Sequence, residues 1–127
     1  MMYIEAEKKW MKLHFDQSQT NPIEVSICVT SRKQYINPLL KSMGDMLIVL
    51  PELLERLLHE VYKSFKGTIY EKTPEEVRLM YSLASIELKD DNKTFWLVLE
   101  PGDVASIFNH FWRFTMVEGK LTWSNLP

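Results

Sequence analysis

The stretch Ile23–Thr30 reads IEVSICVT, and its residues alternate between apolar and polar. Successive side chains of a strand point to opposite faces, so this alternation places four apolar residues on one face and four polar ones on the other. Such a pattern is typical of a strand that covers a core with one face and meets solvent with the other. We take this strand as the starting point for the fold.

A second alternating segment, Lys9–Asp16, precedes it. Met11, Leu13 and Phe15 fall on the face expected to cover the core, and Trp10 falls on the opposite face. A helix over this segment is the weaker alternative. The intervening residues 17–22 are typical of a loop, which predicts a hairpin of two strands.

Helices are predicted after these strands. Pro51–Lys66 carries one apolar stripe at helical spacing, and Gly67 is a natural C-cap. A shorter helix is expected from Asn37, with Gly44 just past its end. The sequence Thr-Pro-Glu-Glu at positions 73–76 is a capping box, so a third helix is expected to begin there and to give way to a strand near residue 85. The spacing over 77–85 also fits a strand, which stays open as the alternative.

The C-terminal third is predicted to consist mainly of hairpins. One joins Ile86–Lys89 to Thr94–Glu100, and a second follows over 112–123. A short helix is expected between them, over 103–110. The strand Thr94–Glu100 is apolar on both faces, which favours a central strand or one with an interface on its outer face. The pattern predicts an α+β fold with an antiparallel sheet of about five to six strands and about two to four helices packed on one face.

Composition limits the class of protein. A chain of 127 residues with 46% hydrophobic residues is expected to fold as a single domain, 1–127. The net charge of −2 argues against nucleic-acid binding, which needs a basic surface. The single Cys28 cannot form an internal disulfide, and the N-terminus lacks the apolar stretch of a secretion signal. We expect a cytoplasmic protein that does not enter a membrane, since the longest apolar run has five residues.

No motif predicts catalysis. The chain has no glycine-rich phosphate loop, and its three histidines lack the spacing of a metal site. Cys28 lies on the outward face of its strand without a neighbour in the sequence that would activate it. The adjacent carboxylates have structural explanations in caps and turns. We therefore expect no catalytic residues, no metal and no cofactor, and we predict that the protein is not an enzyme.

Aromatic and acidic residues remain as candidates for binding another protein. Tryptophan is enriched at protein interfaces because it offers a large contact area. The predicted partner-binding residues are Trp96, Trp112, Asp90, Asp91, Glu52 and Glu55.

In these features the chain resembles the small immunity proteins of bacterial polymorphic-toxin and contact-dependent inhibition systems. The resemblance rests on the acidic residues, which also include Glu75 and Glu76, and on the aromatic strands Phe95–Leu99 and Phe111–Phe114. It implies a cytoplasmic, non-catalytic inhibitor that binds one toxin domain and occludes its active site. The first functional hypothesis is therefore a protein-binding module of this kind.

Two alternatives stay open. The chain could form a pocket between sheet and helices that binds a small ligand or acts as an enzyme, with His110, Glu100 and Tyr81 in it. It could also be a subunit that associates with itself as a homodimer, burying the outer face of Phe95–Leu99 against a second copy.

Overall fold

The strands of the computed structural model pair in chain order, from β1 at one edge of a seven-stranded sheet to β7 at the other. The structure describes residues 1–102 and 110–126. The strands are β1 (Met2–Ile4), β2 (Lys9–His14), β3 (Ile23–Cys28), β4 (Tyr81–Leu88), β5 (Thr94–Pro101), β6 (Phe111–Val117) and β7 (Lys120–Leu126). A 3-10 turn, η1 (Glu5–Glu7), joins β1 to β2. The helices are α1 (Asn37–Ile48), α2 (Leu50–Phe65) and α3 (Pro74–Met80).

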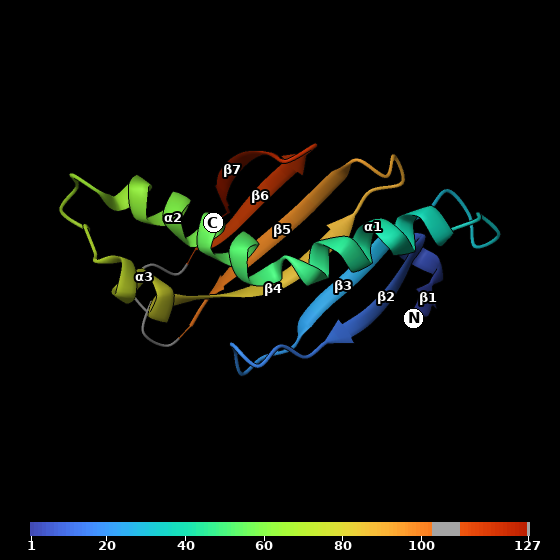
Figure 1. Ribbon diagram of the computed structural model, residues 1–127, viewed down its shortest axis with the longest axis horizontal. Helices are drawn as coiled ribbons and strands as arrows, with labels where there is room; N and C mark the ends of the chain where they lie inside the picture. The colour runs from blue at the N-terminus through green and yellow to red at the C-terminus, as the bar shows by residue number, and fades with distance from the viewer. Residues whose placement is uncertain (103–109, 127) are drawn as a thin grey trace.

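The three α-helices of the described residues lie between β3 and β4 in the chain, and α1 and α2 form a layer over one face of the sheet (Figure 1). Neighbouring strands are antiparallel except β3 and β4, which are parallel. A parallel pair needs a long crossover between its strands, and the helical segment supplies it. The prediction of an α+β fold with a mostly antiparallel sheet is confirmed, while the sheet has more strands than the hairpins indicated.

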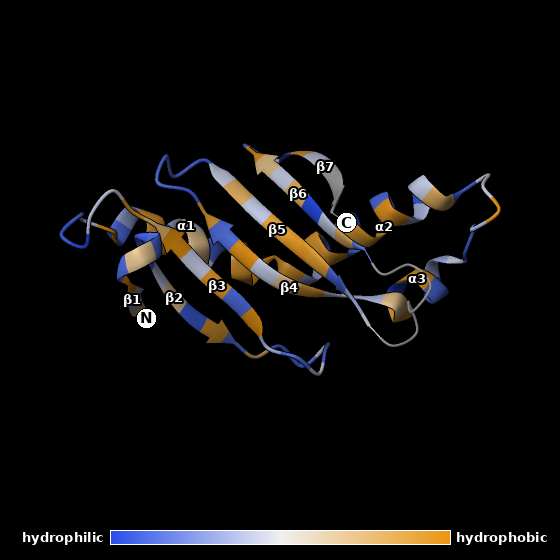
Figure 2. Cartoon of the chain, turned by 180° about the vertical axis from the view of Figure 1, so that it is seen from behind, coloured by the Kyte–Doolittle hydropathy of each residue, from blue (hydrophilic) through white to orange (hydrophobic). Residues whose placement is uncertain are grey.

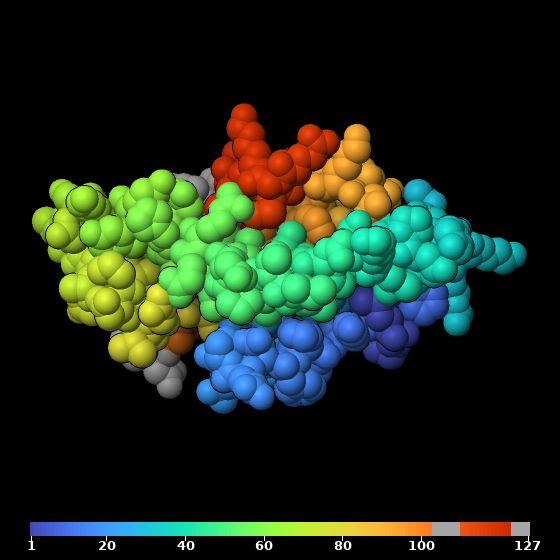
Figure 3. Space-filling model, viewed as in Figure 1, coloured from blue at the N-terminus to red at the C-terminus, as the bar shows by residue number. Residues whose placement is uncertain are grey.

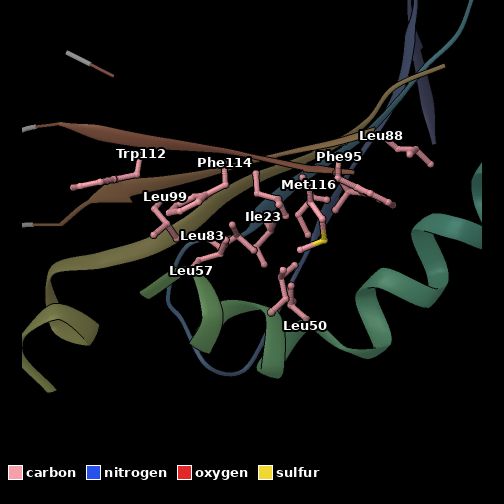
Figure 4. Packing of buried hydrophobic residues seen from close by; sticks show 14 of the residues in the cluster. Ile23, Leu50, Leu57, Leu83, Leu88, Phe95, Leu99, Trp112, Phe114 and Met116 are labelled. Atoms are coloured by element: carbon pink, nitrogen blue, oxygen red, sulfur yellow. The ribbon is translucent and has the colours of Figure 1, made fainter. Parts of the chain in front are cut away.

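The longest helix, α2, places its apolar stripe against the sheet. Leu53, Leu57 and Val61 recur at helical spacing and are all buried. Figure 4 shows the facing side chains of the sheet, among them Phe114 and Leu99, lying toward this helix. Every second residue of β3, β5 and β6 adds to the same core, because alternate side chains share one face of a strand. In β4 an irregularity between Leu83 and Ser85 shifts this alternation by one residue, and Ile86 and Leu88 continue the core face.

The third helix begins as predicted. The Thr73 side chain accepts a hydrogen bond from the backbone N–H of Glu76, and the Glu76 side chain accepts one from the backbone N–H of Thr73. This capping box ends the preceding loop, and the helix gives way directly to β4 at Tyr81. The strand therefore begins about four residues earlier than expected, because Tyr81 and Leu83 both reach the core.

The predicted inward face of β2 is wrong. Trp10 pairs with the fully buried Ile27 and packs against the core, whereas Leu13 is 53% exposed and Phe15 is 75% exposed. A shift of one residue exchanges the two faces of a strand. The ring of Tyr3, on the unpredicted strand β1, lies 5.1 Å from the Trp10 ring, centre to centre, so the large indole is covered by a partner that alternation could not indicate.

Two further expectations concern helices. Gly44 was expected to lie beyond the first helix, but α1 continues past it to Ile48. Glycine lowers helix propensity without breaking a helix, and the buried Met43 keeps this turn packed on the sheet. The short helix expected over 103–110 falls almost wholly outside the described residues.

Candidate functional site

One face of the sheet carries no helix from residues 1–102 and 110–126; Figure 2 looks directly onto it. We call this surface the open face. Trp96 lies on this face, on the interior strand β5, and its flanking residues Phe95 and Leu97 are buried on the other side. Alternation along β5 therefore places this tryptophan on the second apolar face that the sequence pattern indicated for this strand.

Two cations hold the Trp96 ring. The Lys89 ammonium nitrogen lies 3.4 Å from the ring centre, and the Arg113 guanidinium carbon lies 4.7 Å from it. Lys89 directly follows β4, and Arg113 lies on β6, so the strands on both sides of β5 each supply one cation. Cations over an indole face are attracted by the ring electrons, which stabilises this arrangement by about 0.5–1 kcal/mol per pair where solvent reaches it.

Beside this cluster, ion pairs run across β2, β3 and β4. The Lys9 ammonium lies 2.9 Å from a Glu7 oxygen, 3.8 Å from a Glu24 oxygen and 3.7 Å from a Glu87 oxygen. Lys89 also forms an ion pair with Glu87. The side chains of Lys9 and Glu87 are 16% and 20% exposed, so these pairs lie partly out of solvent.

The network holds Glu87 ionised. Burial would raise the pKa of Glu87, but the hydrogen bond from Lys89 and the charges of Lys89 and Lys9 outweigh it and lower this pKa below its usual value. The hydroxyl of the buried Ser26 lies 3.4 Å from a Glu87 oxygen and donates a further hydrogen bond. Burial also opposes the charge of Lys9, yet the hydrogen bond with Glu7 and the nearby carboxylates raise its pKa.

Arg113 differs from the two lysines. It makes no ion pair with any other residue in the described part of the chain, where its guanidinium contacts the Trp96 ring. The open face therefore presents an aromatic ring next to a cation that has no carboxylate partner among the described residues. Tryptophan and arginine are the residue types that most often dominate the energy of protein interfaces.

Cys28 also lies on the open face and is half-buried. Burial and the nearby Glu87 carboxylate raise the pKa of the Cys28 thiol, against the smaller effects of Lys89 and Lys9. The thiol is therefore protonated at neutral pH and is a poor nucleophile. Nucleophilic catalysis at this position has no support in the geometry.

The predicted partner-binding residues do not form one surface. Asp90 and Asp91 lie in the turn between β4 and β5, close in sequence to the Trp96 cluster, while Glu52 and Glu55 lie on α2 in the helix layer. Asp91 is occupied within its turn, where it accepts hydrogen bonds from the Lys93 and Thr94 backbones. These bonds lower the pKa of Asp91.

The interpretation of Trp112 as a contact residue is wrong. Its side chain is 2% exposed and packs in the core, with its ring 5.9 Å from the Phe65 ring, centre to centre. On β6 it alternates with Arg113, so the same strand gives the tryptophan to the core and the arginine to the open face. Lys89 and Arg113 are not among the residues predicted from the sequence. They come close to Trp96 only because β4, β5 and β6 pair side by side in the sheet.

A cavity of about 360 Å³ lies elsewhere, between α2, the loop from β2 to β3 and the start of β4. Of the three residues expected in a pocket, Tyr81 lines it, while His110 is exposed and Glu100 contacts the Asn21 amide at 3.4 Å. Burial raises the pKa of the Tyr81 hydroxyl, and a hydrogen bond with Trp112 acts in the opposite direction. The expected trio is therefore not brought together.

Neither a metal centre nor a membrane helix emerges from the described residues. No group of three or more His, Cys, Asp or Glu side chains within 1–102 and 110–126 is placed to hold a metal ion. Within the same ranges, no helix is both long and apolar enough to cross a membrane.

Comparisons with known proteins do not indicate a function for this chain. The chain matches no protein-family model, no curated protein and no solved structure.

Proposed function

We propose that this protein is a protein-binding module that inhibits its partner by covering it, and that the open face is the contact surface. The observation that carries the proposal is Trp96, in contact with Lys89 and Arg113 on a sheet face that no helix among the described residues covers. The proposed partner is a toxin domain, in keeping with the resemblance to bacterial immunity proteins.

The chemistry of the face supports a protein partner. The open face also carries exposed apolar side chains, with Leu13 on β2 and both Phe111 and Val117 on β6, the strand next to Trp96. Apolar side chains on an otherwise polar face are typical of surfaces that bind other proteins. A rigid sheet also presents them without an ordering cost on binding.

The charge pattern indicates which group of the partner meets the cluster. Lys9 and Lys89 are balanced by the glutamates of the network, whereas Arg113 is not balanced by any carboxylate of the described chain. A partner carboxylate opposite Arg113 would complete a charge-assisted pair. We therefore propose a partner with an acidic residue at the centre of its contact surface.

The test reverses one charge on the sheet and, as a control, one charge in the helix layer. Partners are captured from the native host with three proteins: wild type, Arg113→Glu and Lys66→Glu. Each captured partner is then purified, and its affinity for all three proteins is measured by titration. Lys66 directly follows α2, so its variant makes the same charge change in the helix layer. We expect one stoichiometric partner that binds wild type and Lys66→Glu equally and binds Arg113→Glu at least about tenfold more weakly.

Either of two results would overturn the proposal. One is a partner that binds Arg113→Glu as tightly as wild type. The other is the absence of any stoichiometric partner for all three proteins. Circular dichroism of the variants shows whether each is folded, so that loss of binding is attributed to the surface.

A further inference from the structure

The cavity next to α2 has a structural origin in the sheet. β3 begins at Ile23 and pairs with β4 through Glu24 and Ser85, whereas β4 itself begins four residues earlier, at Tyr81. The first residues of β4 therefore extend beyond the N-terminal end of β3, where no strand among the described residues pairs with them on that side, and α2 lies above them. This offset leaves the space of about 360 Å³, which is at the small end of the range for ligand pockets.

The loop between β2 and β3 closes one side of this space. The Gln19 amide oxygen accepts a hydrogen bond from the Leu83 N–H at 3.0 Å, and the Gln19 amide nitrogen donates one to the Leu83 carbonyl at 2.8 Å. The side chain thus makes the two hydrogen bonds to β4 that a neighbouring strand would make. The wall is therefore fixed to β4 before any ligand arrives. In Figure 3 the loop, in blue, borders the green α2.

The floor of the pocket is apolar and its rim is charged. The apolar lining consists of Ile23, Leu50, Pro51, Leu54, Leu58, Tyr81 and Leu83. At the rim, an Arg78 nitrogen lies 2.6 Å from each oxygen of Glu55, so these two charges cancel. Asp16 is the remaining charged group of the lining.

Among the described residues no ion pair holds the Asp16 carboxylate, and the electrostatic effect of His14 is the smallest of those that lower its pKa. It accepts hydrogen bonds from the backbone N–H and from the hydroxyl of Ser18. These two bonds lower the pKa of Asp16, so it is ionised at neutral pH. The charged lining therefore sums to one negative charge above an apolar floor.

We propose that this pocket binds a small molecule with an apolar body and one protonated amine, the amine pairing with Asp16. The apolar body removes the leucine-rich floor from water, and the amine supplies the cation that the rim lacks. A ligand with a carboxylate is disfavoured, because it would have to displace Glu55 from both of its contacts with Arg78. This site is separate from the open face and is independent of the proposed inhibition.

The test compares three probes of one shape: 2-phenylethylamine, 3-phenylpropanoate and 2-phenylethanol. Each is titrated into the whole protein, and the methyl NMR signals of Ile23, Leu54 and Leu83 are followed. We expect the amine to shift these signals in a saturable manner and to bind at least about tenfold more tightly than the other two probes. The Asp16→Asn variant keeps the hydrogen-bond acceptor for Ser18 and is expected to lose that advantage.

Two variants complete the design. Leu54→Trp fills the pocket from a half-buried position and is expected to abolish binding, and Asp90→Asn removes a carboxylate from the distant β4–β5 turn and is expected to change nothing. The proposal is overturned if none of the probes binds, if the carboxylate or alcohol binds as well as the amine, or if Asp16→Asn binds the amine like wild type. Because Arg113→Glu leaves this pocket intact, its outcome and the outcome here are distinguishable.

Discussion

The ammonium nitrogen of Lys89 lies 3.4 Å from the centre of the Trp96 ring, across the hairpin that joins β4 to β5. The same lysine forms an ion pair with Glu87, so one side chain links the aromatic cluster of the open face to its ion-pair network. Substitutions of Lys89, Trp96 and Glu87 can therefore measure how much the aromatic cluster and the ion-pair network each contribute to the free energy of unfolding.

A double-mutant cycle with Lys89→Met and Trp96→Leu isolates the contact between the two residues. We expect a coupling free energy of about 0.5–1 kcal/mol in urea unfolding, the usual value for a cation over an indole at a partly exposed site. The loss of the Glu87 pair is common to both variants that lack Lys89 and cancels in the cycle. Lys93→Met serves as the control, since Lys93 is an exposed lysine of the same turn; equal coupling for both lysines would contradict the prediction.

Glu87→Gln is expected to lower the free energy of unfolding by about 1 kcal/mol at pH 7, because it removes a partly buried carboxylate from two ammonium groups. The pKa of Glu87 is lowered by folding, so its contribution is complete above its unfolded pKa near 4.5 and is lost as pH falls through the lower folded value. The difference between wild type and variant should therefore shrink below about pH 4.5. A difference that grows toward acid pH would be incompatible with this network.

Gln19→Ala removes the side chain that pairs with both backbone groups of Leu83. We expect a loss of about 2 kcal/mol in unfolding free energy, because Leu83 is fully buried and its backbone would lose these partners. Hydrogen exchange at the Leu83 amide should accelerate by a corresponding factor. The neighbouring Gln17→Ala, at an exposed position, is the control and should change stability by less than about 0.5 kcal/mol.

Thr73→Ala tests the capping box of α3. Loss of the hydroxyl that accepts from Glu76 is expected to destabilise the protein by about 1 kcal/mol in urea unfolding. Thr73→Ser keeps the hydroxyl and should restore most of that stability. If serine and alanine were equally destabilising, the effect would come from packing of the threonine methyl group.

The two tryptophans of β5 and β6 should respond differently to truncation. Trp112→Ala leaves a cavity in the core and is expected to cost about 3–5 kcal/mol, whereas Trp96→Ala removes an outer side chain and should cost about 1 kcal/mol. Thermal unfolding of both variants measures the contrast. Similar losses for the two variants would contradict the placement of Trp96 on the open face.

Local patterns in the sequence were sufficient for much of this fold. The alternation of Ile23–Cys28, the apolar stripe of α2 and the capping box at Thr73 all depend on residues within one or two turns of each other. Such short-range constraints act before the chain is packed, so they are visible in the sequence. Alternation along β5 likewise separates Trp96 from Phe95 and Leu97, but because both faces of this strand are apolar only its packing shows which face is outward.

Local patterns do not predict which face of β2 covers the core. Its alternation is equally compatible with Trp10 or Leu13 facing the core, and pairing with β3 decides between them. Trp10 faces inward because its strand aligns it with Ile27 and because Tyr3 of β1 covers the ring. Both partners come from other strands, so no property of Lys9–His14 alone contains the answer.

The sequence by itself determined most of the helices and strands, the amphipathic faces of β3 and α2 and the antiparallel hairpins of the C-terminal strands, since these arise from neighbours along the chain. Tertiary structure alone decided that Lys89 and Arg113 meet Trp96 and that Trp112 is buried. It also placed Gln19 against Leu83 and Asp16 at the rim of a pocket. These relationships depend on strand order and register, which are set by long-range packing of the whole sheet against its helices.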